Sequence, residues 1–341
     1  MKAARVQDGK LTLIEDPTPE PAADYARVRI TSAGVCHSDL HLRKGDWGLP
    51  GEGMPLGHEA IGIVEALGPG ADRYVNLGDR VILGLGGAGG GEWCGACEYC
   101  IAGEPRHCSR NNTLMGTFAQ EFCAFAPGLV PIPDSIPDTE APLACGGLTA
   151  YGAVKKLTRH GVTPGRWVAI VGAAGGLGHY AVQLATAFGY RVIGIDAASR
   201  LEFVTSLGAE RAVSIEDAAE VIQNELGGVD ASLVFAARMA GYDLGYSILR
   251  KKGLFVGVGI PALEDGMFQL MPMDMLMREP TVIFSAVGNV QDMRELVELA
   301  SRGIVKTHVG RTGALGDLDE IFDDLQAAKY LGRAVVTDMS R

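Results

Sequence analysis

The sequence has no apolar run long enough to span a membrane, although 47% of its 341 residues are hydrophobic. A spanning helix needs about 18 to 20 consecutive apolar residues, so we expect no membrane partner. No basic block offsets the formal net charge of −11, which disfavours nucleic acid as a partner. The first ten residues, MKAARVQDGK, contain no apolar secretory core, and we therefore expect a cytoplasmic protein that binds a small molecule.

Cysteine is scarce, with seven residues in the chain, of which four lie between Cys94 and Cys108. In a chain expected to be cytoplasmic, such clustering indicates metal binding rather than disulfides. The length allows two domains, because single domains usually contain about 100 to 200 residues.

The first part of the chain, from Ala3 to about Ile132, is made of short strand-like runs broken by Gly, Pro and Asp, which predicts a mainly antiparallel, barrel-like domain. These runs are Ala26 to Ile30, Ala60 to Ala66, Arg80 to Leu83 and Glu121 to Phe125. A proline-rich stretch ends this region. Asp138 or Thr139 would then cap a helix through residues 141–156.

After Pro164, apolar runs alternate with stretches of helical periodicity, which predicts a doubly wound parallel sheet. The runs are Trp167 to Val171, Arg191 to Ile195, Ala209 to Ser214, Ala231 to Phe235, Gly253 to Val258 and Thr281 to Val287. We place the domain boundaries at 1–147, with a metal-binding lobe at about 92–110, and at 148–287. The tail 288–341, which ends in a strand near 333–337, should return to the first domain.

A glycine-rich turn follows the first strand of the predicted parallel sheet. Glycines there permit positive φ and close backbone approach to a pyrophosphate, whose charge the helix N-terminus attracts. Asp196 ends the next strand, where a carboxylate can accept hydrogen bonds from ribose hydroxyls and repel a 2′-phosphate, so NAD is favoured over NADP. Arg200 could instead hold that phosphate, and the glycines could serve packing alone. The turn comprises Gly172, Gly175, Gly176, Leu177 and Gly178.

The segment CGACEYCIAGEPRHC places four cysteines at spacings of two, two and seven intervening residues. Four thiolates can close a tetrahedron around zinc with no open position, as in structural sites. An iron–sulfur cluster uses the same ligands and is the alternative. The predicted ligands are Cys94, Cys97, Cys100 and Cys108.

A second group of metal-binding residue types is spread along the chain. Cys36 stands in GVCHSDLH, His58 and Glu59 in PLGHEA, and Cys145 begins CGGLTAY. Two thiolates and one imidazole would leave the fourth zinc position open for an alcohol oxygen. The spacing does not show that these residues meet in space.

Taken together, these motifs and their order resemble the zinc-containing medium-chain alcohol dehydrogenases, in particular the tetrameric branch of bacteria and yeast, along nearly the whole chain. The resemblance implies a GroES-like, mainly β catalytic domain and a Rossmann cofactor domain, two zinc ions per chain, NAD(H), and a homotetramer or dimer. It also implies reversible oxidation of primary or secondary alcohols to aldehydes or ketones.

The family's site residues map onto matching positions of this sequence. Its catalytic zinc ligands match Cys36, His58 and Cys145, with Glu59 as an occasional alternate ligand. Its carboxylate that orients the histidine ligand matches Asp39. In the family, zinc stabilises the alkoxide, a hydroxyl and a histidine relay its proton, and hydride passes to the nicotinamide.

The relay positions match Ser38 and His41. The family's basic residues near the cofactor pyrophosphate match His37 and Arg333. The two positions that line its nicotinamide match Thr149 and Val258. The alternative for His37 and His41 is that they are solvated loop histidines.

Some features depart from the family pattern. The loop Gly84 to Gly91 is longer and richer in glycine, which predicts a wider or more mobile substrate pocket, with Trp47 as its aromatic wall. The methionine-rich stretch Met267 to Met277 could be a pocket rim or a subunit contact, but core filling is favoured. Cys123 is expected to be a buried small hydrophobe.

Three other functions compete with this interpretation. A polyol dehydrogenase of the same superfamily usually has a carboxylate at the position of Cys145. A zinc-free quinone or enoyl reductase lacks both the GHE histidine and the cysteine quartet. A non-catalytic, cofactor-binding structural or regulatory protein would have no need of Ser38, Asp39 and His41 around an open metal site.

Overall fold

The computed structural model describes residues 1–49, 51–84, 91–112 and 115–341. The chain forms two compact units, Met1–Leu148 together with Val287–Arg341, and Thr149–Ala286. The tail of the chain thus belongs to the same unit as its beginning. Among the described residues, no helix is both long enough and apolar enough to cross a membrane.

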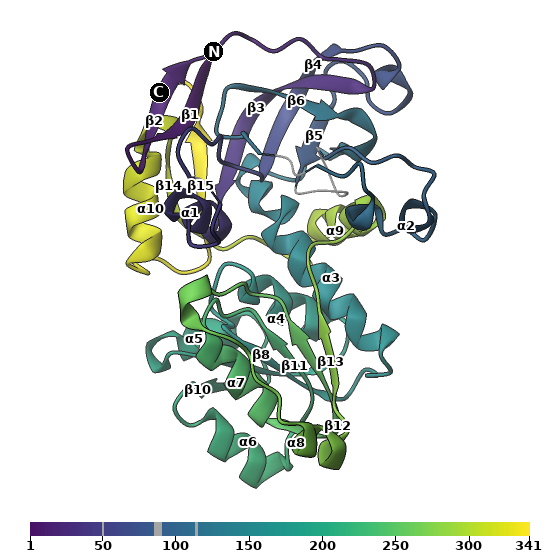
Figure 1. Ribbon diagram of the computed structural model, residues 1–341, viewed down its shortest axis with the longest axis vertical. Coiled ribbons are helices and arrows are strands. Elements are labelled where there is room, and N and C mark those ends of the chain that lie inside the picture. Colours follow the sequence, from purple (N-terminus) through teal and green to yellow (C-terminus); the bar gives the residue numbers. More distant parts are fainter. Residues whose placement is uncertain (50, 85–90, 113–114) are drawn as a thin grey trace. The chain divides into compact units, whose positions relative to one another are not determined.

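The first unit is built on strands that are mainly antiparallel, as the alternating runs predict (Figure 1). Its main sheet has the order β14-β15-β3-β4-β5-β7, β6 pairs with β3, and β1 and β2 form a separate hairpin. Only the pair β14–β15 is parallel in the described part of this sheet. The strands are β1 Lys2–Gln7, β2 Lys10–Glu15, β3 Tyr25–Val35, β4 Ala60–Leu67, β5 Arg80–Leu83, β6 Glu121–Phe125, β7 Val130–Pro131, β14 Val309–Ala314 and β15 Arg333–Asp338.

Alternate residues of these strands form one core. Val28 and Ile30 of β3 and Val336 of β15 belong to this core, and Phe118 meets Phe322 edge to face at 6.2 Å. Because β3 and β15 lie side by side, the C-terminal strand completes a core that the first residues of the chain begin. The helices of this unit are α1 His37–Lys44, α2 Glu98–Ile101, α9 Val290–Ser301 and α10 Leu318–Gln326.

The helix predicted through residues 141–156 is interrupted, so that prediction was wrong. A 3₁₀-helix, Asp138–Ala144, precedes Cys145, and α3 spans Gly146–Arg159. Pro142 lies inside the 3₁₀-helix and has no amide hydrogen for an α-helical bond. No side chain caps this helix at its start, and the Asp138 carboxylate instead pairs with Arg80 at 2.6 Å. Cys145 therefore sits at a break between two helices.

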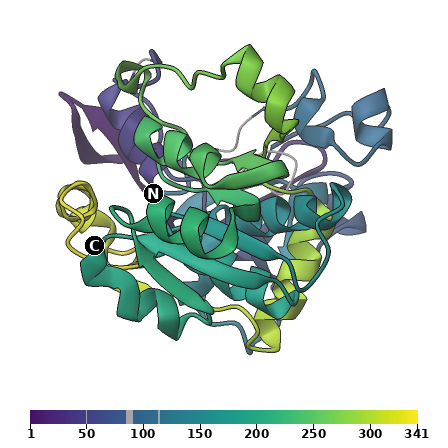
Figure 2. The same cartoon turned by 90° about the horizontal axis from the view of Figure 1, so that it is seen from below.

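The second unit contains the doubly wound parallel sheet that the sequence predicts, with helices on both of its faces (Figure 2). Its strand order is β10-β9-β8-β11-β12-β13, so the order reverses next to β8. Ligands bind at such a reversal in open α/β sheets. The elements are β8 Trp167–Val171, α4 Gly178–Ala187, β9 Arg191–Asp196, α5 Leu201–Ser206, β10 Arg211–Ser214, α6 Ala218–Leu226, β11 Val229–Val234, α7 Met239–Ser247, β12 Leu249–Gly257, α8 Pro272–Arg278 and β13 Thr281–Phe284.

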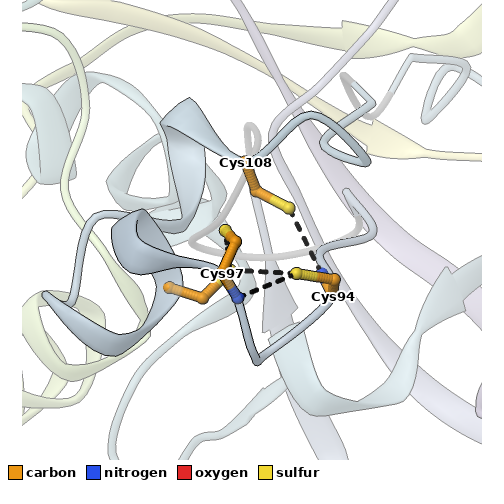
Figure 3. A group of neighbouring side chains, drawn as sticks. Cys94, Cys97 and Cys108 are labelled. Atoms are coloured by element: carbon orange, nitrogen blue, oxygen red, sulfur yellow. Dashed lines mark hydrogen bonds between the residues drawn. The ribbon is translucent and has the colours of Figure 1, made fainter.

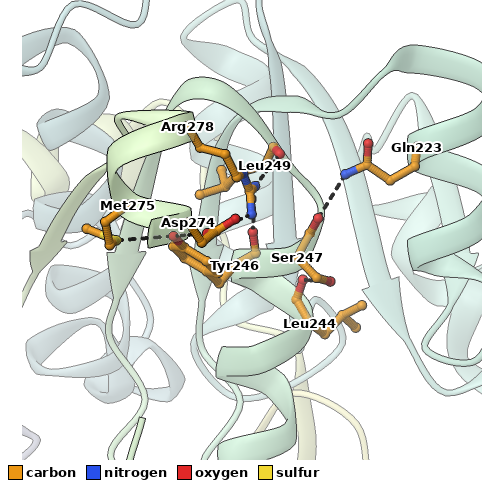
Figure 4. Close-up of polar contacts among 8 residues, drawn as sticks. All are labelled: Gln223, Leu244, Tyr246, Ser247, Leu249, Asp274, Met275 and Arg278. Carbon is orange, nitrogen blue, oxygen red and sulfur yellow. Dashed lines mark hydrogen bonds and ion pairs between the residues drawn. The ribbon is translucent and has the colours of Figure 1, made fainter. Parts of the chain in front are cut away.

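The methionine-rich stretch does not fill the core, which corrects the prediction. Met267, Met271 and Met277 are exposed by 78%, 69% and 63%. Polar contacts hold α8 in place instead: Arg278 donates to the carbonyls of Tyr246 and Leu249, and the Tyr246 hydroxyl donates to Asp274 at 2.7 Å (Figure 4). Met275 lies on the same side and contacts the Tyr246 hydroxyl at 3.2 Å, whereas Met273 and Met277 of this helix remain at the surface.

Candidate functional site

The four clustered cysteines converge within the lobe that contains α2. All four sulfur atoms lie within 4.8 Å of one another. Sulfurs bound about 2.3 Å from one zinc ion are about 3.8 Å apart, and Cys100 Sγ lies 3.5 Å from Cys97 Sγ and 3.9 Å from Cys94 Sγ. Cys94, Cys97 and Cys108 of this cluster are shown in Figure 3. The donor set therefore fits a tetrahedral metal ion.

Backbone amides favour the thiolate form of two cysteines in this cluster, Cys94 and Cys108. The amides of Ala96 and Cys97 donate to Cys94 Sγ at 3.4 and 3.3 Å and lower the pKa of that thiol to about 6. Amides of Cys94 and Arg110 likewise donate to Cys108 and lower its pKa. Because thiolates are the metal-binding form, these amides favour metal binding.

A second cluster joins Cys36, His58, Glu59 and Cys145, all of them buried, with one ligand atom of each within 4.8 Å of the others. Cys36 directly precedes α1, His58 and Glu59 directly precede β4, and Cys145 lies at the helix break. All four residues belong to the first unit. Tertiary structure thus brings Cys145 next to His58 and Glu59, which stand about 87 positions earlier in the chain. The amide of the next residue, Gly146, donates to Glu59 Oε1 at 3.2 Å.

Asp39 orients the imidazole of this cluster. Its Oδ1 accepts hydrogen bonds from Gly57 N at 2.9 Å and from His58 Nδ1 at 3.1 Å. His58 Nε2 is buried and has no hydrogen-bond partner among the described residues. A ring held by a carboxylate on one nitrogen presents the other nitrogen to a metal, so this orphaned atom fits the role of ligand.

The pKa values of the buried Cys36 and Cys145 thiols depend strongly on each other, and that of Cys36 also depends on the His58 imidazole. Burial alone would lower the pKa of His58, but Asp39 and Cys36 outweigh it and raise that pKa well above its usual value. The hydrogen bond with Cys145 lowers the pKa of Cys36 and raises the pKa of Cys145. The two thiols thus share a proton that a bound cation would displace.

Arg333 holds Glu59, one member of this cluster, by an ion pair. Arg333 pairs with Glu59 Oε2 and also donates to the carbonyl of Val35 at 3.0 Å. Burial raises the pKa of Glu59 to about 7, although the guanidinium opposes this. A Cβ on Gly34 would overlap the same carboxylate oxygen. The structure therefore places Arg333 beside Glu59, and its contact with a pyrophosphate stays a prediction.

The residues predicted to relay the proton, Ser38 and His41, lie on α1, which begins with His37 directly after Cys36. His37 is exposed, Ser38 is partly buried, and His41 follows Ser38 by one helical turn. The ring of Trp47 stacks on the His41 ring at 4.9 Å. Sequence reasoning missed Asp46, whose Oδ2 lies 2.7 Å from His41 Nδ1. The sequence GDW alone does not indicate this contact, which forms only because the chain turns back on α1 after Gly45.

The glycine-rich turn of the second unit connects the end of β8 to the start of α4. Gly172 has φ +83°, and a Cβ on Gly178 would overlap the carbonyl oxygen of Gly172, so the start of α4 packs too closely for any side chain. The Asp196 carboxylate accepts hydrogen bonds from Ala174 N at 2.8 Å and Ala197 N at 2.9 Å. Arg200 lies 3.7 Å from the same carboxylate. The acidic residue therefore stands directly beside the turn.

The structure gives only the burial of the residues predicted to line the nicotinamide, and little of the glycine-rich loop before the cysteine quartet. Thr149 and Val258 are buried in the second unit, and the loop at 84–91 lies mostly outside the described residues. His179 of α4 is fully buried, and its Nδ1 lies 3.1 Å from the carbonyl oxygen of Gly175 in the turn. Cys123 is only partly buried, with its sulfur 3.7 Å from the carbonyl oxygen of Pro19.

Two protein-family models match this chain, one mainly in the first unit and one mainly in the second. Residues 22–134 match the family model of the alcohol dehydrogenase GroES-like domain, and residues 176–302 match that of the zinc-binding dehydrogenases. The chain is 36% identical to an alcohol dehydrogenase of Geobacillus stearothermophilus, over 98% of this chain and 99% of that one. It is also 36% identical to an alcohol dehydrogenase of Schizosaccharomyces pombe, over 96% of this chain and 93% of the relative.

Similarity to solved structures extends over the same length. The structure of the alcohol dehydrogenase from Aeropyrum pernix superposes with a TM-score of 0.88 at 32% identity, covering 98% of this chain and 99% of the other. The predicted fold class, a GroES-like domain with a Rossmann-type domain, is confirmed. The chain belongs to the zinc-binding alcohol dehydrogenases of the medium-chain dehydrogenase/reductase family.

Proposed function

We propose that this alcohol dehydrogenase uses zinc and NAD to interconvert primary or secondary alcohols with aldehydes or ketones. The observation that carries the proposal is the buried cluster of Cys36, His58 and Cys145. Three protein ligands of this type leave one zinc position open for substrate. When bound there, zinc would act as a Lewis acid toward the alcohol oxygen.

The side chains around this cluster would prepare it for catalysis. Asp39 holds the Nδ1 proton of His58, which leaves Nε2 free to act as a ligand. Arg333 holds Glu59 by an ion pair, so Glu59 would become an alternate zinc ligand only when that pair breaks. Ser38 would accept the substrate proton, and His41, one helical turn further along α1, would receive it from there.

The contacts of Asp196 support NAD as the cofactor. Two backbone amides hold its carboxylate at the end of β9, where it can accept hydrogen bonds from ribose hydroxyls and repel a 2′-phosphate. Arg200, the residue that could favour NADP, lies beside Asp196 and is neutralised by it. The second zinc would occupy the cluster of Cys94, Cys97, Cys100 and Cys108, where four thiolates leave no open position.

A homo-oligomer is supported by the surface of the second unit. Eight large apolar side chains that are more than half exposed lie between residues 260 and 284. Phe284 belongs to β13, the last strand in the order of its sheet, and the other seven come from the segment that connects β12 to β13. An exposed apolar surface of this kind, next to an open sheet edge, favours pairing with the same surface of a second copy. These side chains are Ile260, Leu263, Met267, Met271, Met273, Leu276, Met277 and Phe284.

Metal analysis combined with a substrate panel tests the proposal. We expect two zinc ions per chain, and activity with NAD on simple alcohols that exceeds activity with NADP or on polyols. Cys36→Ser should lose activity and one zinc while it keeps the fold measured by circular dichroism. Preference for a polyol would instead support the polyol dehydrogenase, and full activity in Cys36→Ser would refute the mechanism.

A further inference from the structure

The chain that follows α1 folds back onto the last turn of that helix. Gly45 adopts the left-handed conformation, with φ 73°, and ends the helix. The amide of Asp46 then donates to the carbonyl of His41 at 3.0 Å, and the amide of Gly48 donates to the carbonyl of Gly45 at 2.9 Å. This tight turn brings two consecutive side chains, Asp46 and Trp47, against the His41 ring.

Asp46 and Trp47 restrain the His41 ring in two different ways. Asp46 Oδ2 lies 2.7 Å from His41 Nδ1 and so fixes the ring within its own plane. Trp47 covers one face of the ring, with centroids 4.9 Å apart and planes 27° apart. Trp47 also packs against the core of the first unit. The orientation of His41 is therefore set by its neighbours rather than by solvent.

The contact with Asp46 also decides which ring nitrogen can accept a proton. An ionised carboxylate accepts hydrogen bonds but donates none, so Nδ1 must carry the hydrogen. In neutral imidazole the other nitrogen then has the free lone pair. His41 Nε2 makes no hydrogen bond to any described residue. The ring is thus preset with one proton-accepting atom, Nε2.

We propose that Asp46 is a positioning residue for proton transfer by His41, and that Trp47 supports the same ring. The inference rests on the relay in the proposed function. As the alcohol loses its proton, Nε2 gains one, and the imidazolium that forms is balanced by the Asp46 carboxylate. Release of that proton to solvent restores the neutral ring, so no oxidant or reductant is consumed at His41. Asp46 itself does not contact the substrate.

A double-mutant cycle tests this role, with Asp46→Asn, His41→Gln and the double variant. We expect His41→Gln to lower kcat about 10-fold or more, and Asp46→Asn to lower kcat several-fold with little change in KM. Because Asp46 acts only through His41, adding Asp46→Asn to His41→Gln should cause no further loss. Asp46→Glu should recover part of the activity.

Asp16→Asn is the matched control. Asp16 belongs to the same unit, has a similar exposure of 28% against 24% for Asp46, and pairs with a basic side chain, Arg5. We expect this change to leave kcat unaltered. Unchanged kcat in His41→Gln would overturn the relay in the proposed function. A large loss in His41→Gln together with a normal Asp46→Asn, or with independent losses in the double variant, would overturn only the role of Asp46.

Discussion

Arg333 forms a buried ion pair with Glu59, two residues that stand 274 positions apart in the sequence. Their side chains are 3% and 0% exposed. The pair joins the last strand of the chain, β15, to the residue that directly follows His58. The C-terminal strand therefore helps to build the cluster of Cys36, His58 and Cys145, and does not merely close the sheet.

Removing one partner of this pair should destabilise the first unit. Arg333→Met would leave the Glu59 carboxylate buried without a cation, which costs about 3 to 5 kcal/mol. Arg333→Met combined with Glu59→Gln should recover most of that loss, since no charge is then left unpaired. Urea unfolding measures both changes. Lys252→Met, which breaks an exposed pair with Glu279, should cost less than about 1 kcal/mol; an equal loss in the two single variants would contradict the importance of burial.

Glu140 should make stability depend on pH. It is buried, accepts hydrogen bonds from Thr307 N and Oγ1, and burial raises its pKa above the usual value. Between the unfolded pKa, about 4.3, and the higher folded pKa, the folded chain binds more protons than the unfolded chain. This contribution to stability is therefore present at low pH and is lost as pH rises through that window.

Glu140→Gln removes this titration while it keeps an oxygen that can accept from Thr307. We expect the difference in unfolding free energy between the variant and the parent chain to change across the window and to be constant above it. Urea unfolding at several pH values checks the slope. A difference that does not vary with pH would show that Glu140 does not titrate in the folded state in this way.

The cysteine quartet should support structure rather than chemistry. Cys97→Ser removes one of four ligands, so we expect loss of one zinc ion and a lower melting temperature, because metal binding stabilises such a lobe. Some activity should remain at low temperature. Cys123→Ser, at a cysteine outside both clusters, should keep both ions. Loss of the other zinc in Cys97→Ser would contradict two independent sites.

Asp196 should control the choice of cofactor. Asp196→Ala removes the carboxylate that would bind the ribose and repel a 2′-phosphate, so kcat/KM with NAD should fall by about one to two orders of magnitude and kcat/KM with NADP should rise. Arg200, released from its neighbour, would bind that phosphate. Adding Arg200→Ala should then abolish the gain with NADP. If the two cofactors respond equally to Asp196→Ala, the carboxylate does not select between them.

The exposed methionines should matter for association. Met271→Lys with Met277→Lys places two cations on the apolar surface next to β13, and light scattering should report a smaller particle than the parent oligomer. Leu77→Lys alters a side chain of the first unit that is 63% exposed, and its particle mass should not change. An unaltered mass in the methionine variant would rule out this surface as the contact.

Local sequence was sufficient for features that neighbouring residues determine. The quartet was predictable because four thiols within one short loop can reach the same ion. The parallel sheet was predictable from the alternation of apolar runs with helical periodicity, and the turn at Gly172 from the backbone space that glycine provides. In each case the residues that interact are close in the chain or repeat with a regular period.

Tertiary structure decided the features that depend on distant residues or on competing local preferences. Pro142 broke a helix that periodicity predicted, and this break placed Cys145 beside Cys36 and His58. Met273 and Met277 of α8 became surface residues because hydrogen bonds from Arg278 fix the other side of the helix. Asp46 acquired a role only when a tight turn folded it onto His41. Spacing along a chain cannot report such contacts, since they arise from packing that every element of the fold contributes to at once.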